Sequence, residues 1–552
     1  MKRSTLSALA LASVAAVGAA PERADAFCGF YVSGSSEQLT NKATRVALMR
    51  HGQRTVLTMS NDYDGPPQDF AMVVPVPIVL QQENVRTLPH DVFSRIESLT
   101  APRLVEYWEQ DPCYVEPPMP DNAGMAMPTS APMRSRISGS AADLGVRIEA
   151  QFTVGEYQIL VLSATQSSGL ETWLRQNRYN IPNGAASALA PYIREGMKFF
   201  VARVDIRRVT RRPDGGARLS PLRFHYDTQD FRLPVRLGLL NAPEKQDLIV
   251  YVLHPTARVE VANYPNVFVP TNIDLEPAMR ETFGRFYTTL FDRTLERMNG
   301  RAVVTEYAWA TSSCDPCPTP PLGPNELATL GLDVLDPSSA QQPPQAPMPG
   351  RWRGRPTGGA SRFAYGMTVT RMHTRYDART LSEDLVFREA GAVAGGREHV
   401  IDAQTGALEQ GAQPAQYGGN NFQARYAIRH PWTGPIRCQN PRRGIWGAPP
   451  AGTQQQPTRP ALDLASRTGA AVELPRAVRS AIPELGIRGA HAGARPGAAP
   501  AVVRPSSSPT PGRITRPVRV QPKPSRSVGL TAGGLSALAV LALAGRRLAK
   551  KR

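Results

Sequence analysis

Proline-rich segments limit which parts of this 552-residue chain can fold into a packed core. Proline fixes φ and lacks a backbone N–H, so it interrupts helices and is excluded from ordinary central strands. The chain contains 52 Pro and 45 Gly, which are frequent in residues 117–142, 316–360 and 447–527. We expect surface loops or a linker in the first two segments and a disordered, Pro/Arg-rich spacer in the third.

The N-terminus has the pattern of a signal peptide. A basic start, Lys2 and Arg3, precedes an apolar stretch that ends near Val17, and Ala24–Ala26 is the small-residue motif that signal peptidase cleaves. A transmembrane anchor would need roughly 20 apolar residues, more than this stretch contains. We therefore expect residues 1–26 to be removed and the protein to be exported.

The C-terminus consists of an uncharged apolar stretch, 528–545, followed by a basic end, 546–552. This length is just enough to span a hydrocarbon core, and a basic cluster stays on the cytoplasmic side. The residues that would stop transfer are Arg546, Arg547, Lys550, Lys551 and Arg552. We expect a transmembrane or sorting helix at 528–545, so that the protein is located in the cell envelope, anchored in a membrane or sorted to the cell surface.

The net charge of +18 is concentrated in the predicted spacer and basic end. From Gly447 onward there are 17 Lys and Arg against three acidic residues, so this part carries +14 and the remainder +4. The arginines of the spacer are spread singly with almost no aromatic residues, unlike the clustered faces that bind nucleic acid. We expect no nucleic-acid partner. The membrane, through the apolar helix, is the expected partner. Anionic envelope polymers fit the spacer better than nucleic acid does, but we favour a solvated linker that holds the folded part away from the membrane.

The segment after the signal peptide alternates predicted strands with a few helices. Val46–Met49 and Thr55–Met59 flank a turn and predict a hairpin. Further strand candidates are Gln158–Ala164, Lys198–Val209, Leu222–Tyr226, Leu248–Leu253, Ala302–Trp309, Ala364–Tyr376 and Phe422–His430. The helix candidates are Gly169–Gln176, Ala186–Arg194 and Glu276–Met298, the last with an apolar stripe of 3.6-residue period.

The apolar run Phe70–Leu80 is broken by Pro75 and Pro77, so we expect an edge strand or a bulged strand there. These patterns together predict an α+β fold with a mainly antiparallel sheet and a few helices, besides the disordered Pro-rich linker and the C-terminal transmembrane helix. The expected division is 1–26 signal peptide, 27–315 exported α+β domain, 316–360 linker or loop, 361–446 β-rich segment completing the first domain, 447–527 spacer, 528–545 helix and 546–552 basic end.

The five cysteines are Cys28, Cys113, Cys314, Cys317 and Cys438. In an exported protein we interpret them first as disulfide partners, with Cys28 bonded to Cys113 and Cys438 bonded to Cys314 or Cys317. The C-x-x-C element allows a redox centre as an alternative, but Pro320 and Pro321 prevent the helix that usually follows one. A zinc site would need further ligands, for which Cys438 and a distant His430 are the candidates.

A search for catalytic motifs gives no assignment. The sequence has no phosphate loop, dinucleotide fingerprint, zinc-protease motif or nucleophile elbow. The eight histidines (His51, His90, His225, His254, His373, His399, His430 and His491) show no metal-ligand spacing. The acidic segment 61–69 does not match a calcium loop, and Asn, Asp, Gly and Pro favour a turn there. We assign no catalytic residue and expect no cofactor and no metal.

Several ordered segments resemble the domain-of-unknown-function family 2330, whose members are exported bacterial proteins, many of them myxobacterial. The segments are Phe27–Val32, Arg54–Met59 running into Asn61–Tyr63, Asp69–Pro77, Ala101–Trp108, Ser313–Cys317 and Arg429–Trp432. The resemblance covers roughly Phe27 to Trp446. It implies export, a cysteine-containing exterior domain and often a C-terminal membrane segment, but no activity, substrate or catalytic residue.

Two hypotheses for the function follow. The first, which we favour, is a non-catalytic binding or structural module of the envelope. The second is an exported enzyme, either a thiol redox protein acting through Cys314 and Cys317 or a carboxylate-based hydrolase using Asp62, Asp64 and Asp69.

Overall fold

The computed structural model describes residues 30–33, 43–61, 70–113, 146–177, 179, 181, 184–211, 217–241, 245–336, 366–397, 411–415, 419–450, 459–462 and 471–489. The chain divides into two units, 1–498 and 499–552, and all described residues belong to the first. The predicted signal peptide, Cys28, the acidic segment 62–69 and the helix 528–545 with its basic end lie outside the described residues. Among the helices that the structure describes, none is long and apolar enough to span a membrane.

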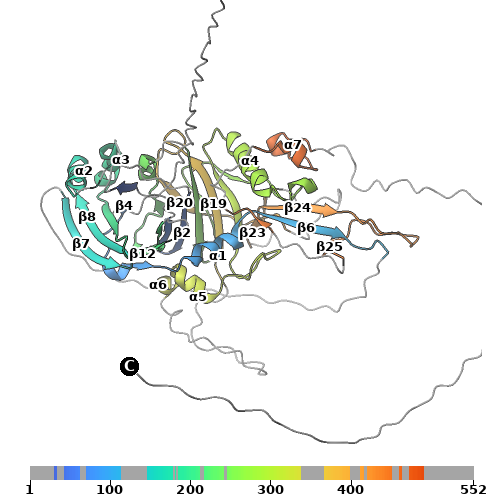
Figure 1. Ribbon diagram of the computed structural model, residues 1–552, viewed down its shortest axis with the longest axis horizontal. Coiled ribbons are helices and arrows are strands. Elements are labelled where there is room, and N and C mark those ends of the chain that lie inside the picture. The colour runs from blue at the N-terminus through green and yellow to red at the C-terminus, as the bar shows by residue number, and fades with distance from the viewer. Residues whose placement is uncertain are drawn as a thin grey trace, which may run out of the picture. The chain divides into compact units, whose positions relative to one another are not determined.

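The largest element is a mixed sheet of eleven strands, mainly antiparallel (Figure 1). In spatial order the strands are β22 (Gln413–Pro414), β21 (Val393–Gly395), β23 (Asn421–Gln423), β18 (Val303–Ala310), β19 (Thr368–Tyr376), β14 (Gln246–His254), β2 (Ala43–His51), β3 (Arg54–Asn61), β12 (Leu222–Asp227) and β5 (Val85–Thr87), with β16 (Asn266–Phe268) beside β18. The pairs β14–β2, β16–β18 and β21–β23 are parallel. The predicted α+β class is confirmed.

The predicted hairpin is β2 and β3, which pair antiparallel from Thr44 opposite Asn61 to His51 opposite Arg54. Gly52 in its two-residue turn has φ of +58°, the left-handed region that such turns require. On the other side of β2 lies β14, and β19 lies between β14 and β18. The segment 361–446 therefore supplies a strand to the middle of the large sheet.

A second, antiparallel sheet has the order β1 (Phe30–Ser33), β4 (Phe70–Val76), β9 (Lys198–Val204), β8 (Tyr157–Ala164) and β7 (Val146–Val154). The prediction that the Pro-containing run is an edge or bulged strand is wrong, because β4 pairs on both sides. β1 reaches only Val73, so Pro75 is paired on one side alone, opposite Phe199. Proline lacks a backbone N–H, and it is tolerated at this position because, among the described residues, no strand on the other side of Pro75 requires that donor.

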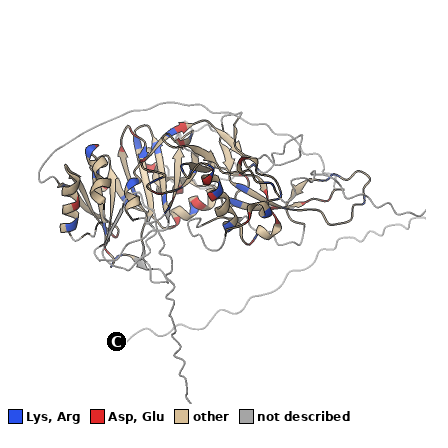
Figure 2. Ribbon diagram, turned by 90° about the horizontal axis from the view of Figure 1, so that it is seen from above, with Lys and Arg blue, Asp and Glu red and all other residues tan. Residues whose placement is uncertain are grey.

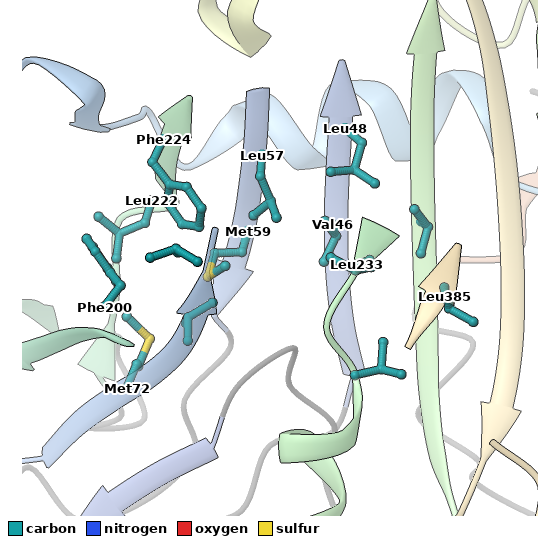
Figure 3. Close-up of a cluster of buried hydrophobic side chains, with 14 of the residues drawn as sticks. Val46, Leu48, Leu57, Met59, Met72, Phe200, Leu222, Phe224, Leu233 and Leu385 are labelled. Carbon is teal, nitrogen blue, oxygen red and sulfur yellow. The ribbon is translucent and has the colours of Figure 1, made fainter. Parts of the chain in front are cut away.

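Both faces of this second sheet are covered. Residues alternate along β4, so that Ala71 and Val73 face a cluster shared with α2 (Ser167–Gln176) and α3 (Ala185–Arg194). Met72, Val74 and Val76 face the opposite way, into the largest hydrophobic cluster. Figure 3 shows this cluster, where Met72 and Phe200 meet side chains from β2, β3 and β12 of the large sheet.

A third sheet has the order β17 (Ile273–Asp274), β24 (Arg425–His430), β6 (Arg103–Glu109) and β25 (Trp446–Gly447), with β26 (Arg459–Pro460) also paired to β6. The predicted helix Glu276–Met298 divides into a 3-10 turn, η3 (Pro277–Met279), and α4 (Phe283–Glu296). Its predicted stripe packs against this sheet and β18 through Phe286, Tyr287 and Leu290. The apolar periodicity therefore identified the right face of α4.

The described part also contains shorter elements. They are η1 (Gln82–Asn84), α1 (Asp91–Thr100), η2 (Arg236–Asn241), η6 (Pro483–Leu485), the pair β10 (Thr210–Arg211) and β11 (Ala217–Arg218), and a small sheet of β13 (Arg232–Leu233), β20 (Leu385–Ala390) and β15 (Arg258–Val261). The strand predicted over Lys198–Val209 ends at Val204.

The predicted linker 316–360 contains packed structure, which corrects that expectation for residues 324–335. These residues form α5 (Pro324–Leu327), η4 (Ala328–Leu332) and α6 (Asp333–Leu335). Their leucines are buried in a cluster with α1, β2 and β14. The prolines of this segment argue against helices, but Pro324 is the first residue of a helix, a position that tolerates proline.

Part of the predicted spacer 447–527 is folded, which corrects that expectation for residues 459–462 and 471–489. Ala461, α7 (Leu474–Ala477), Val478 and Ile487 pack into the cluster beneath α4. These few apolar side chains in a Pro- and Arg-rich stretch bury enough surface to hold it on the folded unit. Residues 490–527 lie outside the described residues.

Candidate functional site

The structure pairs four of the five cysteines. Cys113 is bonded to Cys438 and Cys314 to Cys317, with Cα–Cα distances of 5.4 Å and 4.9 Å. The expectation of disulfides is confirmed for these four, but the expected pairing of Cys28 with Cys113, and of Cys438 with the C-x-x-C element, is wrong. β6 and β24 run parallel, so the residues that follow them come to the same end of the sheet. Cys113 follows β6 and Cys438 follows β24, which brings these two together.

The C-x-x-C loop follows β18 and is held by buried side chains of two other strands. Arg103 Nη1 on β6 donates to the Pro316 carbonyl at 3.0 Å, and the side-chain amide of Gln423 on β23 donates to the Asp315 carbonyl. The Asp315–Pro316 peptide bond is cis. Cys317 is exposed, whereas Cys314 is half-buried. The expectation that no thioredoxin-type helix follows is confirmed, because the next helix begins at Pro324.

Arg103 connects this loop to the interior. Its side chain is fully buried, and Nη2 donates to the Leu99 carbonyl at the end of α1 at 2.5 Å. The guanidinium also lies 5.8 Å from the Tyr307 ring centroid. Burial, together with the nearby cations of Arg425 and Arg371, lowers the pKa of Arg103 to about 10, so the side chain is still cationic at neutral pH.

The C-terminal ends of β6 and β24 carry an aromatic and charged cluster. The Trp108 and His430 rings stack at 4.7 Å, and His430 Nε2 lies 2.9 Å from Glu106 Oε2. Glu106 also pairs with Arg280, at 2.9 Å. The zinc alternative is wrong for the predicted ligands, because Cys438 is in a disulfide and His430 is bonded to Glu106. No group of three or more potential metal ligands occurs among the residues that the structure describes.

Glu109 fixes the segments on both sides of Cys438. Its carboxylate accepts hydrogen bonds from both Nε and Nη2 of Arg443 at 2.8 Å and from the backbone N–H groups of Trp432 (2.9 Å) and Gly444 (2.8 Å). Burial by itself raises the pKa of Glu109, but these four hydrogen bonds outweigh burial and lower it. Glu109 is 4% exposed, so this carboxylate is a structural anchor for the loop.

A buried ionic network, which we call the Glu306 network, lies where β18, β19 and β14 meet. A bulge at Glu306 turns its side chain toward β19. There it accepts from Arg371 Nε at 2.6 Å and from the Tyr287 hydroxyl at 2.7 Å, and it lies 2.9 Å from His373 Nδ1. The other ring nitrogen of His373 lies 3.0 Å from Asp247 Oδ1. The other members of the network are Glu97, Tyr251, Asp292 and Arg375.

Mutual pairing fixes the charge states of this network. Burial raises the pKa of Glu306, but His373 and Arg371 outweigh burial and lower it to about 2. Burial likewise lowers the pKa of His373, but Glu306 and the hydrogen bond to Asp247 raise it to about 8. Phe291 of α4 stacks on the His373 ring at 4.0 Å, and Glu306 and His373 are at most 1% exposed. The Glu306 network therefore joins α4 to the sheet.

The sequence contained a signal for this network that motif searching missed. Glu306 lies inside a strand whose other residues are apolar or aromatic except for Thr305, and the predicted strand 364–376 contains Arg371, His373 and Arg375 at alternate positions, on one face. A charged side chain in such a strand must find a partner when it is buried. Of the other candidates, Asp62, Asp64, Asp69 and the basic residues 546–552 lie outside the described residues.

The comparisons with known proteins point to a family alone. A family model described as "Uncharacterized protein conserved in bacteria (DUF2330)" matches residues 22–388. This match ends within β20, so the more C-terminal segments of the resemblance, including the one with His430, lie beyond it. No curated protein and no solved structure matches the chain.

Proposed function

The chain belongs to the DUF2330 family of bacterial proteins, and we propose that it is an exported envelope protein whose folded unit is a non-catalytic binding or structural module. The single observation that carries the proposal is the Cys113–Cys438 disulfide, which joins residues 325 positions apart. Disulfides of this kind form and persist in oxidising compartments and are rare in the cytosol. The signal-peptide pattern of residues 1–26 also supports export.

The C-terminal sequence supports attachment to a membrane. The apolar stretch 528–545 and the basic residues after it fit a membrane-spanning or sorting helix. The Pro/Arg-rich spacer would hold the folded unit away from the membrane and could bind anionic envelope polymers. Both assignments rest on the sequence.

A non-catalytic role is supported by how the buried charges are used. Buried carboxylates such as Glu306 and Glu109 are bonded to cations and backbone groups rather than directed toward a substrate. Figure 2 shows Lys and Arg interspersed with Asp and Glu over the described part, which agrees with this mutual pairing. A carboxylate-based hydrolase remains the alternative, with Asp62→Asn and Asp64→Asn as its test: loss of a detected activity would favour it.

Fractionation of cells that produce the native protein tests the proposal. We expect the protein in the envelope fraction with Phe27 as its N-terminal residue, and release from that fraction when 528–552 is deleted. Recovery from the cytosol with Met1 retained would contradict export. Retention in the membrane after the deletion would contradict attachment through this tail.

A further inference from the structure

The two sulfurs of the C-x-x-C disulfide differ in access. Cys317 is exposed at the surface. Cys314 is half-buried against a hydrophobic cluster that includes Trp309 and Leu322. Thiol–disulfide exchange depends on access to the sulfur that is attacked. A thiol in solution therefore reaches Cys317 more readily than Cys314.

The loop does not depend on its disulfide for its position. The Asp315 and Pro316 carbonyls, between the two cysteines, accept hydrogen bonds from Gln423 and Arg103, whose side chains are fully buried. Below them, the Leu322 N–H donates to the Thr311 carbonyl at 3.0 Å and closes the base of the loop. These bonds are independent of the sulfur atoms, so the reduced loop keeps its two thiols close together.

A buried cation is bonded to the loop between the two cysteines. The Arg103 guanidinium donates to the carbonyl of Pro316, the residue directly before Cys317. Because a cation close to a cysteine stabilises thiolate relative to thiol, we expect Arg103 to favour the reduced form of this loop.

We propose that the Cys314–Cys317 disulfide is a thiol–disulfide exchange site, which takes two electrons from small-molecule or protein thiols that reach Cys317. A thiolate attacks Cys317 Sγ, a new S–S bond forms, and the Cys314–Cys317 bond breaks. Its electron pair goes to Cys314 Sγ, which then takes a proton from water. A second thiolate attacks the sulfur of the first thiol in this mixed disulfide. The bond to Cys317 breaks, its electron pair goes to Cys317 Sγ, and the two attacking thiols leave as a disulfide. Both cysteines are then reduced.

The Cys113–Cys438 disulfide provides an internal control in the same molecule. Both of its cysteines are half-buried. The segment around them is held by the Arg442 N–H bond to the Pro112 carbonyl at 2.8 Å and by the contacts of Glu109. We infer that this disulfide is structural and resists thiols that reduce the other one.

Graded reduction of the full-length, folded protein by glutathione tests the proposal. A Cys28→Ser background confines the signal to the four paired cysteines. Acid quenching, alkylation and peptide mass spectrometry then follow each disulfide separately, while near-ultraviolet circular dichroism reports folding. We expect Cys314–Cys317 to be reduced about tenfold faster than Cys113–Cys438, with the folded signal unchanged. Equal rates, or reduction of Cys314–Cys317 only after unfolding, would overturn the proposal.

Two single variants test which sulfur is attacked. Cys314→Ser leaves the exposed Cys317, and Cys317→Ser leaves the half-buried Cys314. With oxidised glutathione we expect Cys314→Ser to form the mixed disulfide about fivefold faster. Equal or reversed rates would contradict attack at Cys317. The exchange reduces each Cys314–Cys317 disulfide once and involves no turnover, so it goes beyond the proposed non-catalytic envelope function without replacing it. An inert Cys314–Cys317 disulfide would leave export and the Cys113–Cys438 bond unaffected.

Discussion

The helix-covered sheet β1-β4-β9-β8-β7 and the cross-linked sheet β17-β24-β6-β25 are stabilised in different ways. The first packs apolar side chains on both faces, against α2 and α3 on one side and the large sheet on the other. The second also has an apolar face, but its strands are fixed by the Cys113–Cys438 disulfide and by ion pairs such as Arg429 with Asp274 and Arg443 with Glu109. The helix-covered sheet therefore depends on packing, and the cross-linked sheet on contacts between residues far apart in the chain.

Removing the Cys113–Cys438 disulfide should cause the largest loss of stability. We predict that Cys113→Ser with Cys438→Ser lowers the free energy of unfolding by about 4–5 kcal/mol, because that bond closes a very long loop. Urea denaturation under oxidising conditions measures the loss. The matched double variant, Cys314→Ser with Cys317→Ser, removes a disulfide that closes only a four-residue loop. It should lower the free energy of unfolding by about 2 kcal/mol or less. Equal losses would remove the distinction between the two disulfides.

A similar loss is expected when a charge of the Glu306 network is removed. We predict that Glu306→Gln lowers the free energy of unfolding by about 3–5 kcal/mol, because Arg371 and His373 lose their shared, buried partner. Glu296→Gln is the control, since Glu296 pairs with Arg293 at the surface, where such pairs contribute about 0–1 kcal/mol. A loss for Glu306→Gln as small as that of the control would show that the network is not stabilising.

A packing variant tests the helix-covered sheet. We predict that Leu174→Ala in α2 costs about 3 kcal/mol, because this fully buried side chain leaves a cavity under the helix. Leu462→Ala removes the same atoms from a side chain that is 45% exposed and should cost less than about 0.5 kcal/mol. Thermal unfolding followed by circular dichroism distinguishes them. Similar values for both would contradict the packing account of the helix-covered sheet.

The smallest predicted effect is a pH dependence. The folded-state pKa of His373 is raised from 6.5 to about 8, so its stabilising contribution is complete below pH 6.5 and is lost as pH rises through 8. The loss is about 2 kcal/mol. Glu306 acts in the opposite direction, with a contribution present above pH 4.5 and lost as pH falls toward 2. Urea titrations from pH 6 to 9 should show the His373 step, and an unchanged step in His373→Asn would assign it to another group.

The two sheets also differ in how much of them the sequence predicts. The strand candidates 158–164 and 198–209 correspond to β8 and β9, and the helix candidates 169–176 and 186–194 to α2 and α3. The 3.6-residue apolar stripe predicted α4, because burial on one face of a helix leaves a local pattern. β6 was missed as a strand although Ala101–Trp108 was singled out, since Arg103 and Glu106 interrupt its apolar pattern. The disulfide pairing could not be predicted, because it follows from the parallel pairing of β6 with β24, strands more than 300 residues apart.

We propose that the folded unit resides in an oxidising compartment, where its Cys113–Cys438 and Cys314–Cys317 disulfides form. The most direct test is non-reducing peptide mapping of the native protein, recovered from fractionated cells and alkylated at harvest. We predict a Cys113–Cys438 cross-link in nearly every molecule, with Cys314 bonded to Cys317 unless thiols have reduced it. Free Cys113 and Cys438 in the harvested protein, or a bond from either to Cys28, would contradict the claim.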